Sequence, residues 1–119
     1  MQEPETTASV PLQVTYRGMD RSEALEERIA ERVDKLTKTG ERILDAKVSV
    51  EASQPHNRGH LFSVHAVVRT PHGEFVVSND KDPTGSHEDA YVAVRDAMDA
   101  LQRRIIEKRE REIERRQRP

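Results

Sequence analysis

An apolar stripe near the C-terminal end is the feature that most constrains how this chain folds. The stripe consists of Tyr91, Val94, Met98, Leu101 and Ile105. Successive members are 3, 4, 3 and 4 residues apart, which is the spacing that places side chains along one side of an α-helix. We predict that Ser86 opens this helix, with Glu88 and Asp89 in its first turn, where the helix dipole favours carboxylates. Tyr91 is then expected to pack in the core as the first member of the stripe.

A second helix is predicted closer to the N-terminus. Its stripe consists of Leu25, Ile29, Val33 and Leu36. These residues are 4, 4 and 3 positions apart, so they also lie on one side of a helix. Either Asp20 or Ser22 can cap its first turn. We expect the helix to extend to about Lys38 and to end at Gly40.

Four segments alternate between apolar and polar residues, which is the pattern of half-buried strands. They are residues 10–16, 46–52, 60–70 and 74–78. Residues 53–59 have the composition of a turn, and a tight turn at residues 70–73 joins the last two strands as a hairpin. We expect Phe62 and Phe75 in the core. The polar residues expected on the solvent side of the sheet are Gln13, Lys47, Ser49, Glu51, Ser63, His65, Arg69 and Glu74. Val67 and Val76 do not fit that side.

These elements follow one another in the order β-α-β-β-β-α. Hydrophobic residues make up only 34% of the 119 residues, so the fold must leave little apolar surface uncovered. We therefore predict an α+β fold of two layers, with a four-stranded sheet and both helices on one face. Residues 1–9 are expected to be a disordered lead-in, and residues 10–106 to be the folded domain. Residues 107–119 form a charged extension that either continues the last helix or frays as a tail.

Composition and motifs exclude several functional classes. The chain has no cysteine, and its first residues show neither the basic nor the apolar region of a secretory signal. No segment approaches the ~18–20 apolar residues of a membrane span, so we expect a soluble protein of the cytoplasm. The five histidines lack metal-ligand spacing, and capping explains the segment His87-Glu88-Asp89. Phosphate-loop and nucleophile motifs are also absent. We predict no enzymatic activity, cofactor, metal site or small-molecule substrate.

The charged residues are more informative in their arrangement than in their sum, which is only −2. The first helix carries a row formed by Arg28, Arg32 and Lys35. The last helix carries a row formed by Arg104, Lys108, Arg111, Arg115 and Arg118. Both rows run beside acidic rows, so one interpretation is a pair of solvated helices laced with ion pairs. The other interpretation is that neighbouring helices bring the two basic rows onto one exposed surface that follows phosphates.

Residues in every element favour the second interpretation. They are Leu25, Ile29 and the segment Val33-Asp34-Lys35-Leu36, the hairpin Thr70-Pro71-x-Gly73 with Ser78, the segment 87–94 that spells His-Glu-Asp-Ala-Tyr-Val-Ala-Val, and Leu101-Gln102-Arg103. Over about residues 10–110, this set resembles the ribosome hibernation-promoting factor family, which includes the cold-shock ribosome-associated inhibitor. The resemblance implies a domain that binds the small ribosomal subunit in the channel used by messenger and transfer RNA. Such a domain inhibits translation by occupying that channel, without catalysis.

The resemblance also implies which residues face ribosomal RNA. They are Arg32, Lys35, Lys38 and Arg103. The basic rows add Arg28, Arg104, Lys108 and Arg111 as candidate contacts. Ala100 and Glu107 depart from short family members, which carry lysine there.

Other possibilities stay open at this point. A double-stranded RNA-binding domain would also present a pair of helices on a sheet. A non-ribosomal protein-interaction module could use the charged extension as a partner helix. The resemblance is to short members, without the second domain through which long members dimerise ribosomes. Whether idle ribosomes are held singly or in pairs, and the oligomeric state of the chain, are not predicted.

Overall fold

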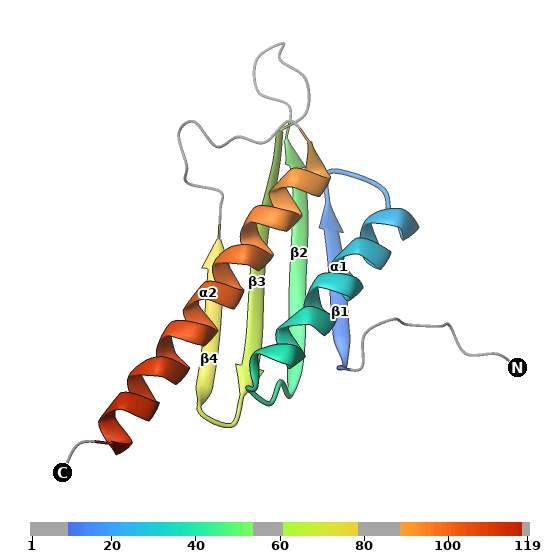
Figure 1. Ribbon diagram of the computed structural model, residues 1–119. Coiled ribbons are helices and arrows are strands. Elements are labelled where there is room, and N and C mark those ends of the chain that lie inside the picture. Colours follow the sequence, from blue (N-terminus) through green and yellow to red (C-terminus); the bar gives the residue numbers. More distant parts are fainter. Residues whose placement is uncertain (1–9, 54–60, 79–88, 118–119) are drawn as a thin grey trace, which may run out of the picture.

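The chain folds into two layers, a sheet and a pair of helices. The computed structural model describes residues 10–53, 61–78 and 89–117. Its strands β1 (Leu12–Arg17), β2 (Asp45–Ser53), β3 (Leu61–Thr70) and β4 (Gly73–Ser78) form one sheet in the order β1-β2-β3-β4. Helices α1 (Glu23–Leu36) and α2 (Ala90–Arg116) cover the same face of that sheet (Figure 1). The predicted α+β architecture and element order are confirmed.

The strand directions explain where the helices lie. β1 and β2 are parallel neighbours, so α1 is the crossover between them and packs over that half of the sheet. β2, β3 and β4 are antiparallel, and β3 turns into β4 directly, with Thr70 opposite Gly73. α2 crosses the other half of the sheet, over β3 and β4 (Figure 1). The two helices therefore lie side by side above the sheet.

Local capping determines where α1 begins and ends. Ser22 is the N-cap, and its side-chain oxygen accepts a hydrogen bond from the Leu25 amide at 3.1 Å. Of the two predicted caps, the structure therefore uses Ser22 and not Asp20. α1 continues into a short 3₁₀ helix, η1 (Thr37–Thr39), which carries Lys38. Gly40 ends it in the left-handed region with φ of 94°, as its position in the sequence predicted.

The start of α2 differs from the prediction. The helix begins at Ala90, so Asp89 is its N-cap rather than part of its first turn, and its carboxylate accepts from the Tyr91 amide at 2.8 Å. Ser86, His87 and Glu88 lie outside the described residues, as do the expected lead-in 1–9 and most of the turn 53–59. At the other end α2 continues to Arg116, so the charged extension is helical up to that residue.

The core lies between the sheet and the two helices. It contains both predicted helical stripes from Leu25 to Leu36 and from Val94 to Ile105, packed on the apolar side of the strands. Phe62 and Phe75 are half-buried against it. Tyr91 was expected in this core, but the expectation is wrong, because Tyr91 remains 39% exposed.

The other side of the sheet is open to solvent and carries the polar residues predicted for it. Among the exceptions anticipated from the sequence, Val76 is 40% exposed and Val67 is half-buried. One ion pair on this face joins neighbouring strands. Arg69 donates both Nε and a terminal nitrogen to the Asp45 carboxylate.

Candidate nucleic-acid interface

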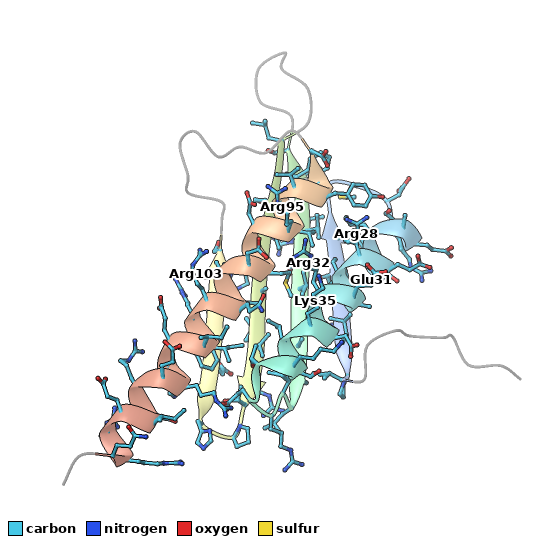
Figure 2. All side chains as sticks on the ribbon, in the orientation of Figure 1. Arg28, Glu31, Arg32, Lys35, Arg95 and Arg103 are labelled. Carbon is cyan, nitrogen blue, oxygen red and sulfur yellow. The ribbon has the colours of Figure 1, made fainter. Side chains whose placement is uncertain are left out.

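The first basic row lies along the side of α1 that faces α2. Leu25, Ile29 and Val33 bury one side of α1 in the core, which leaves the row of Arg28, Arg32 and Lys35 on the neighbouring side. Figure 2 shows these three residues in a line beside α2, on the layer that covers the sheet. The row is therefore presented by the helical layer and not by the open face of the sheet.

Arg32 connects the two helices. Its Nη1 donates to Oδ1 of Asp99 on α2 at 3.1 Å, and the Arg32 side chain is only 21% exposed. The positive charge of the row is thus balanced at this position by an acidic partner. The ion pair links α1 to α2 above the core that both helices share.

Lys35 and Lys38 are the least engaged cations of the row. Both side chains are exposed, and neither has a hydrogen-bond or ion-pair partner within the described part of the chain. They lie in the last turn of α1 and in η1, where the negative end of the helix dipole favours cations. An anion that approaches this end of the layer meets two ammonium groups that pair with no carboxylate of the described residues.

α2 contributes Arg103 and Arg111, which are also exposed without a partner among residues 10–53, 61–78 and 89–117. The structure adds Arg95, which sequence analysis missed. Arg95 is half-exposed on α2 and pairs with its neighbour Asp96 at 3.1 Å. The sequence could have indicated this residue, because Arg95 directly follows the buried Val94 and consecutive helical residues lie on different sides of the helix.

Arg104 and Lys108 are placed differently from the rest. Arg104 donates to the backbone oxygen of Val76, and Lys108 donates to that of His72 at 2.9 Å. Lys108 also lies 5.6 Å from the centre of the Phe75 ring. These groups belong to β4 and its turn, so both side chains extend away from α1. The predicted shared surface for the two complete rows is therefore not formed.

The two side chains cover the outer edge of the sheet. β4 is an edge strand, and an edge strand exposes backbone groups that another chain could pair with. The carbonyls of His72 and Val76 are four residues apart, so Lys108 and Arg104 donate to two backbone acceptors along this edge, one in the turn before β4 and one within β4. The first two residues of the second basic row thus cover this edge.

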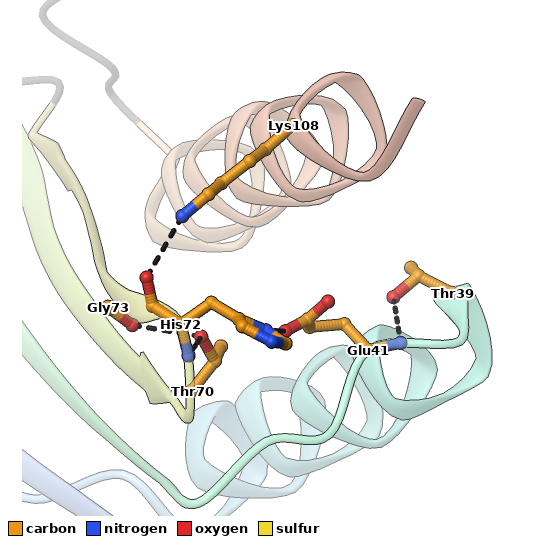
Figure 3. A network of polar contacts seen from close by, with 6 residues as sticks. All are labelled: Thr39, Glu41, Thr70, His72, Gly73 and Lys108. Atoms are coloured by element: carbon orange, nitrogen blue, oxygen red, sulfur yellow. Dashed lines mark hydrogen bonds and ion pairs between the residues drawn. The ribbon is translucent and has the colours of Figure 1, made fainter. Parts of the chain in front are cut away.

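A polar network extends from Lys108 across the end of the sheet (Figure 3). Nδ1 of His72 lies 3.1 Å from Oε2 of Glu41, which follows η1. The hydroxyl of Thr70 donates to the Gly73 carbonyl at 2.9 Å and accepts from the His72 amide at 3.1 Å. The network joins α2, the β3–β4 turn and Glu41, which follows η1.

The open face of the sheet offers a different surface. It contains a shallow pocket of about 260 Å³, lined by Arg17, Ser49, Glu51, Ser63, Val64, His65 and Ser78. Opposite charges at Arg17 and Glu51 leave this pocket without a net attraction for phosphate, and its lining contains His65 but no phenylalanine, tyrosine or tryptophan ring for base stacking. Within the described residues, no cluster of three or more His, Cys, Asp or Glu side chains could hold a metal ion.

We call the exposed cations Arg28, Lys35, Lys38, Arg103 and Arg111 the basic face of the helical layer. The carboxyl and hydroxyl groups whose pKa values are shifted do not belong to it. Arg21 donates to both carboxylate oxygens of Glu26 at 2.9 and 3.1 Å, and this holds the pKa of Glu26 below its ordinary value. Arg69 likewise lowers the pKa of Asp45. Burial raises the pKa of Tyr16, whose hydroxyl donates to the Ser22 carbonyl. These groups anchor local structure.

Comparison with known proteins connects this arrangement to a family. The family described as Sigma 54 modulation protein / S30EA ribosomal protein matches residues 12–113. The chain belongs to this family. The match spans all four strands and nearly all of α2, so it confirms the resemblance inferred from the sequence. The description is of a ribosome-associated modulation protein and not of an enzyme.

Two solved structures share the fold. One is a ribosomal subunit interface protein from Coxiella burnetii, with a TM-score of 0.63 at 18% identity, over 83% of this chain and 97% of that chain. The other is the N-terminal domain of Protein Y from Thermus thermophilus, with a TM-score of 0.64 at 16% identity, over 84% and 96%. Across the segments that the structure describes, no helix is long and apolar enough to cross a membrane.

Proposed function

We propose that this protein inhibits translation by binding the small ribosomal subunit through the basic face of its helical layer. The bound domain occupies the channel used by messenger and transfer RNA, and it excludes both without catalysing a reaction. Family membership supports the ribosome as the partner. The unpaired cations on one layer of the fold support ribosomal RNA as the surface that is contacted.

One observation carries the assignment of the surface. Lys35, Lys38 and Arg103 are exposed on the helical layer, and none has a partner in residues 10–53, 61–78 and 89–117. Surface cations in proteins gain phosphate contacts most readily when no carboxylate competes for them. We assign the phosphate contacts to these three together with Arg111, which also has no partner in those residues, and with Arg28, whose ion pair with Glu31 is long at 3.7 Å and lies at the surface.

The other three candidate residues support the face indirectly in this proposal. Arg32 holds the two helices together through Asp99, while Arg104 and Lys108 hold α2 against β4. A rigid layer keeps the contacting cations at fixed spacings, so binding does not require them to be ordered first. The protein then binds as a rigid, preformed domain and not as a flexible basic segment.

Co-sedimentation with purified small subunits tests the proposal. The variant Lys35→Glu/Arg103→Glu reverses two cations of the basic face and should lose co-sedimentation. The matched control Arg17→Glu/Lys47→Glu reverses two exposed cations on the open face of the sheet, so it changes the net charge equally. The control should sediment like the wild type. Equal loss in both variants would show that binding follows total charge and would overturn the assigned face.

A competition experiment tests the channel. Small subunits that already hold a messenger RNA and a transfer RNA should bind the protein much more weakly than empty subunits. Equal binding would contradict occupancy of the channel while leaving ribosome association intact. A gel shift with naked RNA duplexes addresses the alternative of a double-stranded RNA-binding domain, which predicts tight binding there. Nuclease-resistant capture of a protein partner would favour the interaction-module alternative.

A further inference from the structure

Tyr91 stands apart from the other aromatic residues of the chain. The sequence contains two tyrosines, two phenylalanines and no tryptophan. Tyr16, Phe62 and Phe75 pack against the core, and the Tyr16 hydroxyl donates to a backbone carbonyl at 3.0 Å. Tyr91 is 39% exposed, and its hydroxyl has no partner among the residues that the structure describes. Its contribution to the core is therefore small.

The Tyr91 ring is held in place by α1. The guanidinium carbon of Arg28 lies 5.5 Å from the ring centre, which is a cation–π contact between the two helices. Arg28 is itself 49% exposed and also approaches the Glu31 carboxylate at 3.7 Å. The Tyr91 backbone is fixed by the Asp89 cap in the first turn of α2. An aromatic ring and a cation are thus presented together at the surface.

The pair lies on the same helical layer as the basic face. Arg28 begins the row that continues through Arg32 to Lys35 (Figure 2). In RNA recognition, unpaired bases stack on exposed aromatic rings or arginine planes, while neighbouring cations hold the phosphates. The row supplies the phosphate contacts, and the exposed Tyr91 ring supplies a surface beside them on which a base can stack.

Resting on the proposed function, we propose that Tyr91 and Arg28 form a stacking site for one unpaired RNA base. Tyr91 contacts the face of the base, and Arg28 braces the ring and contacts the adjoining phosphate. Every base has an aromatic face, so this site takes an unpaired nucleotide without selecting its sequence. The partner is single-stranded RNA beside the phosphate track, not a duplex.

Affinity for small subunits at several salt concentrations tests this site. Tyr91→Ala should weaken binding about tenfold at every salt concentration, the scale of one lost base–aromatic stack. The dependence of affinity on salt should not change, because no charge is removed. The control Tyr91→Phe keeps the ring and should bind within about twofold of the wild type. Thermal unfolding checks that the exposed position leaves the fold intact.

A direct measurement separates a base from any other ligand. Tyr91→Trp places the only tryptophan of the chain at the site. Its fluorescence should be quenched by a short unstructured oligoribonucleotide and not by an abasic oligomer of equal length and charge. Equal quenching by both, or by neither, would overturn base stacking.

The outcomes distinguish the two proposals. Failure of the wild type to bind small subunits would reject the proposed function. Binding by the wild type with an equal affinity for Tyr91→Ala would reject only the stacking site. Weaker binding by Tyr91→Ala without quenching of the tryptophan variant would also overturn it, because the ring would then contact protein and not a base.

Discussion

Gly18 is the position at which a single methyl group should most disturb the layer that carries the basic face. Gly18 connects β1 to α1 with φ of 71°, a conformation that L-residues rarely adopt. A β-carbon there would lie 2.3 Å from the carbonyl oxygen of Ala52 on β2, whereas ordinary contacts begin at 3.4 Å. The obstacle is backbone within the sheet, so it cannot move aside as a side chain would.

The expected cost of Gly18→Ala follows from three contributions. The left-handed conformation costs an alanine about 1–2 kcal/mol. The collision resembles overpacking of a core, which costs about 1–3 kcal/mol. Alanine also lowers the conformational entropy of the unfolded chain relative to glycine, which stabilises the fold by about 0.4–1 kcal/mol. We expect a loss of about 3 kcal/mol in the free energy of unfolding.

Gly40→Ala is the matched control. Gly40 has φ of 94°, so it carries the same kind of strain, but the nearest atom to its β-carbon is Nη1 of Arg109 at 2.1 Å. That atom ends a flexible side chain and can swing away, so we expect a loss of only about 1 kcal/mol.

Thermal and urea unfolding of the two variants measure the difference. A gap of about 2 kcal/mol corresponds to a melting temperature roughly 10 °C lower for Gly18→Ala. In the background Arg109→Ala, Gly40→Ala should cost no more than its backbone strain. Equal losses at Gly18 and Gly40 would refute the reasoning, because they would show that the approach to Ala52 is not rigid.

Three further predictions concern edges and ion pairs. Arg104→Ala/Lys108→Ala uncovers the free carbonyls of β4, so sedimentation should show more concentration-dependent self-association than for the wild type. The pKa of Glu26 is lowered in the folded state, so its ionised form stabilises the fold above its unfolded pKa of about 4.3, and this is lost as pH falls through the folded pKa. Glu26→Gln should therefore flatten the acid side of the stability profile. A double-mutant cycle on Arg32 and Asp99 should give a coupling of about 0.5–1 kcal/mol, and no coupling would reject the interhelical bridge.

The sequence predicted the elements well because each has a periodic apolar pattern. The stripe from Leu25 to Leu36 and the alternation around Val48 and Val64 each match the buried side of one element. The start of α2 was missed because Ser86 and Asp89 are both good caps, and propensity alone does not choose between them. The parallel pairing of β1 with β2 also needed tertiary information, since a strand pattern does not state its neighbour.

The candidate site was harder to predict. The sequence shows which residues share one side of a helix, but it does not show which element that side faces. Arg104 and Arg95 flank the same buried stripe of α2 on opposite sides. Which side faces α1 depends on how α2 lies across the sheet, and only the structure shows that Arg104 faces β4. Tyr91 was assigned to the core by its spacing, but it lies where the stripe meets the flank covered by Arg28.

The division of the cations into two groups has a measurable consequence for affinity. If all eight sequence-derived candidates contacted phosphate, log K would fall with log[salt] at a slope of roughly −6 to −7. The structure engages Arg32, Arg104 and Lys108 in hydrogen bonds within the protein, which leaves the five cations assigned to phosphate and a slope of roughly −4. Arg104→Ala should therefore leave the slope unchanged, whereas Lys35→Ala should reduce its magnitude by about 1. A wild-type slope near −7 would show that the engaged side chains release their protein partners on binding, and the rigid layer would then be the wrong description of the bound state.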